Sequence, residues 1–474
     1  MHTRTVKTTA EPRLTPGGNG VDGFAQTFQG ELIWPDDPGY EQARRVWNGM
    51  IDKRPALIAR CADAGDVRAA VNFARAHDVL LSVRGGGHNV AGKAVCDDGL
   101  VVDLSALRGV QVDPVRRVAR VQGGATLGDL DRRTQAFGLA VPVGLVTATG
   151  IAGLTLHGGM GWLTRQYGLT LDNLLAVEIV TADGQLRRAS ETENADLFWA
   201  IRGGGGNFGI VTSFEFRAHP AGPEVWFLAT MYPLSQAREV LCFVREFMTH
   251  APEELGVLVT LWSAPDEPYV QKEYRGAPAV IVLGCYSGLL ADGAEVIRPL
   301  REIADPIADL SSRQLFLDVQ RFFDADYPDG RFYYWKSIYL EDLSDEVIAA
   351  TVDHAATRPS PLTSLDIWFL EGAMNRVPAD KTAYARRDVK YALAFESNWT
   401  HPEHSDANIT WTRAVFQDMQ RFACGTYLNF PGFTEDAGRL LQGAYDVNYG
   451  RLRSIKTRYD PENLFHGVLN IVPG

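Results

Sequence analysis

The stretch Leu80-Leu81-Ser82-Val83-Arg84-Gly85-Gly86-Gly87-His88-Asn89 decides the fold. Its apolar start predicts a buried strand, which ends at three consecutive glycines. Residues without a Cβ let the backbone adopt positive φ and approach a ligand closely. Successive N–H groups in such a turn can bind a diphosphate. His88 follows at once as a nucleophile, so the stretch predicts a tethered nucleotide cofactor.

The residues around this turn predict an α+β fold. Residues 66–76 place their apolar side chains on one helical face, and the strand at 80–83 follows. This strand–helix–strand opening is typical of α+β proteins. Further strands are expected at 100–104, 117–122, 139–141, 176–181 and 210–216, with a helix at 196–202.

The character of the sequence changes after His219-Pro220. Glycine-rich loops give way to longer alternating strands, at 225–231, 280–283 and 367–370. Helices are predicted between them, at 234–251 and 291–307. We expect a domain boundary near 218–223. The last fifty residues predict a helix at 440–458 and a short closing strand.

Composition bounds the class of protein. A chain of 474 residues is too long for one ordinary core, so two domains are expected. The net charge of -12 disfavours nucleic acid and anionic membranes as partners. No apolar run is long enough to span a membrane. Residues 1–25 are expected to be flexible, and the N-terminus lacks the apolar segment of a signal peptide.

Five scattered cysteines form no C-x-x-C pair, which argues against a metal site and for a reducing cytoplasm. Gly204, Gly206 and Gly209 satisfy G-x-G-x-x-G. A Rossmann site needs a strand before this motif and a helix after it, and here the order is reversed. A nicotinamide dehydrogenase is therefore the weakest alternative.

The run from Gly150 to Trp162 has so many small residues that we expect an extended ligand against its backbone. With the 84–92 turn, it belongs to a set of motifs that keep their order along the chain. The others are 102–105, 171–173, 180–184, 197–209, 427–430, 448–452 and 456–465. This set resembles the vanillyl-alcohol-oxidase superfamily, and within it the bacterial berberine-bridge-enzyme-like flavoproteins. Residues 28–35 and 46–52 resemble the branch that contains the flavin-N5-oxide enzyme of enterocin biosynthesis.

The resemblance implies a PCMH-type FAD-binding domain at 26–220 and a substrate-binding domain at 221–425. The latter would be an antiparallel sheet covered by helices, and 426–474 would return to the FAD domain. The flavin would be linked covalently through His88. The implied cofactor-binding residues are Arg84, Gly85, Gly86, Gly87, His88, Asn89, Gly92, Thr147, Thr149, Gly150, Gly153, Leu154, Gly158, Gly159, Gly161, Trp162, Asn173, Ile179, Asn429 and Asn470.

The chain departs from the family at several positions. Val146 stands where many relatives carry a cysteine that forms a second flavin link, so a single bond through His88 is expected. His157 replaces a frequent glycine and either contacts the diphosphate or points outward. Phe430 cannot serve as the base that a tyrosine provides in some plant relatives. Val468 and Leu469 replace an Asn-Gln pair.

Three residues are candidates for the base that takes a proton from substrate. Asp366 lies in an otherwise apolar strand, on the same face as Trp368, where a carboxylate is costly unless it is paired or functional. Its alternative role is a buried structural salt bridge. Tyr427 and Glu396 are the other candidates. Trp368 and Tyr334 are expected to contact substrate, although Tyr334 fits sheet packing as well.

These inferences predict an FAD-dependent oxidoreductase without a metal. It would be an oxidase that removes a hydride from an alcohol, amine or phenolic small molecule and passes electrons to O2. The alternatives are an oxygenase-like flavin-N5-oxide enzyme of a biosynthetic pathway and a flavin-binding protein without turnover. A monomer or homodimer in the cytoplasm is expected, with no nucleic-acid or membrane partner.

Overall fold

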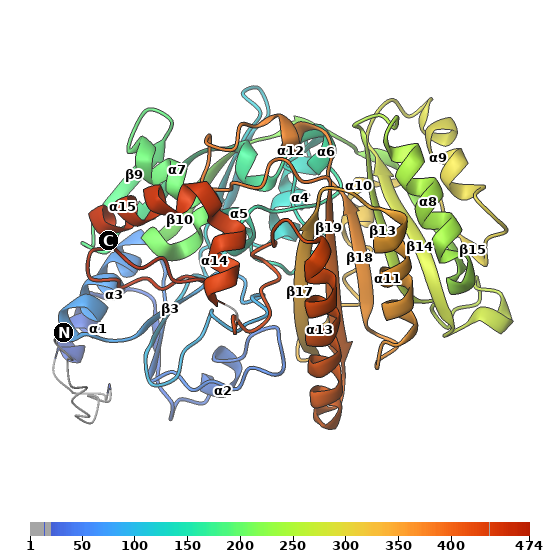
Figure 1. Ribbon diagram of the computed structural model, residues 1–474. Helices are drawn as coiled ribbons and strands as arrows, with labels where there is room; N and C mark the ends of the chain where they lie inside the picture. Colours follow the sequence, from blue (N-terminus) through green and yellow to red (C-terminus); the bar gives the residue numbers. More distant parts are fainter. Residues whose placement is uncertain (1–13, 15–19, 436) are drawn as a thin grey trace.

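A computed structural model describes residues 14, 20–435 and 437–474. The N-terminal half and a large sheet lie side by side, and the C-terminal helices return to the N-terminal half (Figure 1). The predicted division at 26–220, 221–425 and 426–474 remains a prediction. The flexible N-terminus expected over 1–25 lies mostly outside the described residues. Residues 21–25 belong to helix α1 (Val21–Thr27), because Phe24 is buried and stacks on Phe73.

The first sheet carries the glycine turn. Its strand order is β1-β2-β4-β3, formed by β1 (Glu31–Ile33), β2 (Leu57–Arg60), β4 (Leu100–Asp103) and β3 (Leu81–Arg84). Strands β2, β4 and β3 are parallel. Helix α3 (Ala64–His77) connects β2 to β3 and covers the predicted helix at 66–76. It begins where the Asp63 carboxylate accepts a hydrogen bond from Asp66 N.

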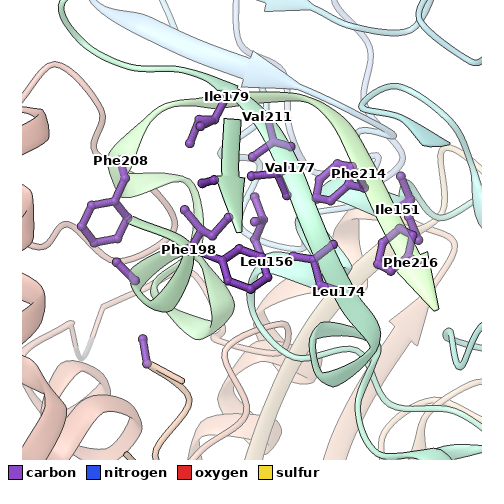
Figure 2. Close-up of a cluster of buried hydrophobic side chains, with 14 of the residues drawn as sticks. Ile151, Leu156, Leu174, Val177, Ile179, Phe198, Phe208, Val211, Phe214 and Phe216 are labelled. Carbon is purple, nitrogen blue, oxygen red and sulfur yellow. The ribbon is translucent and has the colours of Figure 1, made fainter. Parts of the chain in front are cut away.

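A second sheet of five antiparallel strands supports the opposite wall of the site. Its order is β5 (Val110–Asp113), β6 (Val118–Gln122), β10 (Ile210–Arg217), β8 (Leu174–Val180) and β9 (Leu186–Ser190). Phe214 and Phe216 alternate along β10 with polar residues and enter a common core with helix α7 (Ala195–Gly204) and helix α5 (Ile151–Leu156). Figure 2 shows this cluster.

The C-terminal segment packs on this second core. The expected single helix at 440–458 is two helices, α14 (Ala437–Tyr445) and α15 (Tyr449–Tyr459), because Asp446 adopts a positive φ of 40° between them. No strand follows α15 among the described residues, so the expected closing strand is wrong. The buried Lys456 ammonium donates to the carboxylate of Asp460 and to the carbonyl of Asn207, which fixes the segment in place.

The large sheet is antiparallel, and its main order is β15-β12-β14-β13-β18-β19-β17, with β16 beside β12. Helices cover one face of this sheet (Figure 1). The strands are β12 (Glu224–Pro233), β13 (Leu255–Ser263), β14 (Pro278–Tyr286), β15 (Ala308–Asp309), β16 (Ser312–Leu315), β17 (Phe332–Leu340), β18 (Ser364–Phe369) and β19 (Tyr391–Trp399). The helices are α8 (Ala237–Met248), α9 (Gly293–Arg301), α11 (Asp345–Ala356) and α13 (Ser405–Met419). Helix α9 ends six residues before the expected position, 307.

The other α-helices and strands are short. They are α2 (Tyr40–Ala43), α4 (Leu127–Gln135), β7 (Leu139–Ala140), α6 (Thr164–Tyr167), β11 (His219–Pro220), α10 (Phe316–Gln320) and α12 (Ala373–Arg376). The predicted α+β class is confirmed.

The alternation of side chains along β18 positions the site. Leu365, Ile367 and Phe369 enter the core beneath the helices. Asp366 and Trp368 therefore face the other way, toward the N-terminal half. The same alternation sends Tyr333 and Trp335 of β17 to that face.

Candidate active site

The glycine turn after β3 touches the glycine-rich segment before α5. A Cβ on Gly86 would lie 2.3 Å from Gly150 N, and a Cβ on Gly150 would lie 2.3 Å from Gly86 N. The two backbones therefore pack directly on one another. Gly87 has a φ of 72°, which favours glycine. Together these glycines form part of the wall of an internal cavity.

A cavity of about 480 Å³ opens beside this contact and reaches the inner face of the large sheet. Many residues expected to bind cofactor or substrate line it. They are Gly85, Gly86, Gly87, His88, Asn89, Thr149, Gly150, Gly153, Leu154, Asn429, Tyr427, Trp368, Asp366 and Glu396. The fold thus brings the glycine turn and all three candidate bases to one space.

His88 lies on the wall in a fixed orientation. Its ring stacks on the indole of Trp47, with centroids 4.9 Å apart, and its Nδ1 lies 3.4 Å from Thr149 Oγ1. Burial lowers the pKa of His88 to about 3. The imidazole is therefore neutral and keeps a nucleophilic lone pair.

Asp366 and Glu396 lie together on the inner face of the sheet. Asp366 of β18 is opposite Ala394 of β19, so Glu396 is its diagonal neighbour on the same face. Burial raises the pKa of Asp366 to about 6. Burial and then the charge of Asp366 raise the pKa of Glu396 well above its usual range. Asp366 Oδ1 has no hydrogen-bond partner among the described residues.

The hydroxyl of Tyr427 accepts two hydrogen bonds, from Gly159 N at 3.1 Å and from Asn429 Nδ2 at 2.8 Å. Its own hydrogen is thus free to be donated elsewhere. Burial raises the pKa of Tyr427 above its ordinary value. The phenol is therefore a donor at neutral pH. Phe430 meets its ring edge-on and also lines the cavity.

Several predicted site residues do not line the cavity. Tyr334 points to the helix-covered side of β17, where its hydroxyl contacts Glu435 and Arg413. This placement speaks against substrate contact and follows from strand alternation, because Trp335 takes the inner face. Ile179 is buried in the core of the second sheet.

Asn173 and Thr147 hold loops together. The Asn173 amide donates to the carbonyls of Tyr167 and Leu169. Thr147 donates through its N–H and its hydroxyl to Asp324. Neither side chain lies on the cavity wall.

The remaining predicted residues lie behind the wall. Arg84 lines a separate small pocket and donates to the carbonyl of Ala43. Trp162 packs beside Trp368 with its Nε1 unpartnered, and the buried Asn470 Oδ1 also lacks a partner among the described residues. The last four predicted residues are glycines that pack closely on a neighbour. Gly92 packs against Ile51, Gly158 against Tyr427, Gly159 against Thr170 and Gly161 against Val143.

Sequence reasoning missed Trp47, Tyr327 and Trp335, which all line the cavity. Tyr327 and Trp335 meet edge-on, and Trp47 Nε1 donates to the carbonyl of Tyr327. No local pattern marks these residues, because the contacts join positions far apart in the chain. Only Trp335 is adjacent to a residue predicted to contact substrate, Tyr334, which points away from the cavity.

Comparisons with known proteins match this architecture. The family described as FAD binding domain matches residues 55–190, and the family described as berberine and berberine like matches residues 426–472. The (R)-6-hydroxynicotine oxidase of Paenarthrobacter nicotinovorans is 32% identical over 471 residues, with 94% of this chain and 97% of that protein covered. The chain belongs to the berberine-bridge-enzyme-like family of FAD-linked oxidoreductases.

Other relatives agree. The uncharacterized FAD-linked oxidoreductase YgaK of Bacillus subtilis is 31% identical over 455 residues, with 94% of this chain and 97% of that protein covered. The structure of 6-hydroxy-D-nicotine oxidase from Arthrobacter nicotinovorans superposes with a TM-score of 0.84 at 29% identity, covering 94% and 98% of the two chains. That of glucooligosaccharide oxidase from Acremonium strictum gives 0.82 at 27% identity, covering 96% and 100%. That oxidase carries a 6-S-cysteinyl, 8α-N1-histidyl FAD.

The cavity of this oxidoreductase fits FAD. The glycines where the two segments touch have no side chains, so their backbone is exposed to the cavity and a long nucleotide can lie against it. His157 supplies a second test, since its Nδ1 donates to Gly153 O and its buried Nε2 has no partner among the described residues. Burial lowers the pKa of His157, so Nε2 is an acceptor for a hydroxyl or N–H of a bound group. Of the described helices, none is long and apolar enough to cross a membrane.

Proposed function

We propose that this oxidoreductase is an oxidase for an alcohol, amine or phenolic small molecule, with O2 as electron acceptor. The observation that carries the proposal is that one cavity is lined by the His88 turn and by the buried Asp366. Relatives named as hydroxynicotine and glucooligosaccharide oxidases support the choice of O2.

The flavin is tethered through His88 alone. The neutral imidazole is held against Trp47 and faces the cavity. Val146 also lines the cavity, at the position where a second link through cysteine is expected in relatives. An isopropyl group offers no nucleophile, so the number of covalent bonds is one.

Bound FAD would accept the hydride that leaves the substrate carbon. Asp366 takes the proton from the substrate O–H or N–H on Oδ1, which is free to accept it. With its pKa raised to about 6, Asp366 is largely ionised at neutral pH yet more basic than an exposed carboxylate. Tyr427 keeps its proton and donates a hydrogen bond through its hydroxyl to the substrate heteroatom. The side chains of Trp335, Trp368 and Phe430 bind the apolar part of the substrate and exclude water.

The proposal also includes a cytoplasmic location and a monomeric or homodimeric state. All five cysteines are free, which fits the reducing cytoplasm. A monomer or homodimer is sufficient, because both walls of the cavity come from one chain.

Anaerobic mixing of the holoprotein with a panel of alcohols, amines, phenols and reducing sugars tests this function. At least one probe is expected to bleach the flavin absorbance, and admission of O2 is expected to restore it with formation of H2O2. A flavin that no probe bleaches, or that O2 does not reoxidise, would contradict the assignment.

A further inference from the structure

We propose that Glu396 is a positioning residue that retains its own proton and donates it to Asp366, while Tyr327 fixes Glu396 in place. The substrate proton then goes to Asp366 and not to Glu396. This inference rests on the proposed function, because it assigns Asp366 as the base. Of the three candidate bases it leaves Asp366 alone as the base, and it gives the carboxyl group of Glu396 a different role.

Strand register creates the pair. Glu396 of β19 is opposite Ser364 of β18, two residues from Ala394, which is opposite Asp366. Both carboxyl groups therefore leave the sheet on one face and both line the cavity. Each side chain is at least nine-tenths buried, at 6% exposed for Asp366 and 5% for Glu396. Two carboxylates in such a place cannot both be ionised, and one proton is shared or retained.

The surrounding groups decide which carboxyl keeps the proton. The hydroxyls of Thr260 on β13 and Ser364 on β18 face Asp366 and oppose the effect of burial on its pKa, as does hydrogen bonding from Glu396. Glu396 has Tyr327 as its hydrogen-bond donor, with Tyr327 Oη 3.0 Å from Glu396 Oε2. That hydrogen bond by itself favours an ionised Glu396, but burial and then the negative charge of Asp366 have larger and opposite effects, which raise the pKa of Glu396. The proton therefore stays on Glu396.

Tyr327 ties this pair to the rest of the active site. Its carbonyl accepts from Trp47 Nε1 at 2.9 Å, and Trp47 stacks on His88. The neighbouring Asp326 is the other titratable group that acts on Tyr327, and burial raises the pKa of Asp326 to about 6. A neutral Glu396 accepts the Tyr327 hydroxyl without adding a second negative charge to the cavity.

Isotope-edited infrared spectroscopy of the holoprotein tests the inference without a substrate. Protein labelled with ¹³C-glutamate is expected to show a protonated carboxyl C=O band at pH 8, and this band is expected to vanish in Glu396→Gln. In ¹³C-aspartate protein, subtraction of the Asp366→Asn spectrum isolates Asp366, whose protonated band should be half lost near pH 6. The absence of a glutamate band at pH 8, or its survival in Glu396→Gln, would overturn the proposal.

Two variants separate proton donation from simple packing. In Glu396→Gln the amide still donates to Asp366, so the Asp366 midpoint is expected to stay within about half a pH unit. In Glu396→Leu the donor is lost, and the midpoint is expected to rise by about one unit, a tenfold change in proton affinity. Glu246→Gln, exposed on α8, is the matched control. An unmoved midpoint in folded Glu396→Leu would contradict the donor role.

The rate of flavin reduction distinguishes this inference from the proposed function. If Asp366→Asn reduces as fast as the wild type, the proposed base is wrong. If Asp366→Asn is slow but Glu396→Leu keeps the wild-type pH profile of reduction, only the role of Glu396 is wrong. The expected result is a slow Asp366→Asn and an acidic limb displaced upward in Glu396→Leu.

Discussion

The imidazole of His88 and the indole of Trp47 stack nearly parallel, with centroids 4.9 Å apart and an angle of 16° between their planes. Trp47 also stacks on Tyr333, at 3.6 Å. The rings of His88, Trp47 and Tyr333, from distant parts of the chain, thus form one continuous stack. The orientation of the proposed tethering residue is set by β17 of the large sheet as well as by its own turn.

The contact between Gly86 and Gly150 predicts that neither position accepts a side chain. Gly86→Ala would place a Cβ 2.3 Å from a backbone nitrogen, which requires the two segments to separate at a cost of about 1–3 kcal/mol. We expect loss of most bound flavin, measured as the ratio of flavin to protein absorbance. Gly450→Ala in α15 is the control, because its Cβ meets no atom within 4 Å. Full flavin occupancy in Gly86→Ala would refute the packing role of this glycine.

Removal of the charge on Asp366 is expected to slow flavin reduction and leave flavin content unchanged. Asp366→Asn keeps the shape of the side chain but cannot take a proton, so we expect a loss of roughly 10²–10⁴-fold in the anaerobic reduction rate. The carboxylate is required in ionised form, and the wild-type rate should therefore fall as pH decreases through about 6. A rate independent of pH across that range would remove Asp366 from the mechanism.

His157 lines the cavity, and its unpartnered Nε2 is expected to contribute to non-covalent binding of the cofactor. In a His88→Ala background, where no tether forms, His157→Ala should weaken FAD binding by about 1 kcal/mol, roughly fivefold. Fluorescence titration with FAD measures the change. His250→Ala, exposed at the end of α8, serves as the control. Equal affinity with and without His157 would show that its Nε2 has no cofactor partner.

A buried acid between the two halves predicts a pH-dependent stability. Asp131 of α4 accepts from Gln320 Nε2 of α10 at 3.0 Å, and burial raises the pKa of Asp131 to about 7. The raised pKa means that the folded state binds the proton more tightly. Its contribution to stability is fully present below the unfolded pKa, near 4, and is lost as pH rises to 7.

Asp131→Asn should therefore equal the wild type in free energy of unfolding below pH 4 and exceed it at pH 8, by up to about 4 kcal/mol. Denaturant unfolding across this range measures the difference. The exposed Asp266→Asn is expected to show no such pH dependence. A variant that is less stable than the wild type at pH 8 would contradict the interpretation of Asp131 as a protonated acid.

The sequence predicted those helices and strands whose bounds are set by residues close to one another in the chain. Helix α3 and strand β3 follow from an apolar face, an aspartate cap and a glycine stop, and the alternation in β18 correctly put Asp366 and Trp368 on one face. The break between α14 and α15 was missed, because it depends on the backbone of Asp446 and not on a glycine or proline. The expected closing strand failed for a related reason. The final residues pack as irregular chain around Asn207 and Lys456.

The composition of the site depended on tertiary contacts. The sequence placed Asp366, Glu396 and Tyr427 among the candidates separately, and the strand register alone makes the first two a pair. Tyr334 was predicted to contact substrate, whereas Trp335 lines the cavity, because pairing with β19 fixes which residues of β17 face the cavity. Trp47 and Tyr327 gave no chemical signal in the sequence, since their roles are to orient other side chains.

The tether through His88 is the central claim, and acid precipitation followed by peptide mass mapping tests it most directly. Purified holoprotein should give a yellow pellet and one FAD-modified peptide that contains His88, whereas His88→Ala should release all its flavin to the supernatant. A wild-type pellet without colour, or a flavin bound to any other residue, would contradict the account.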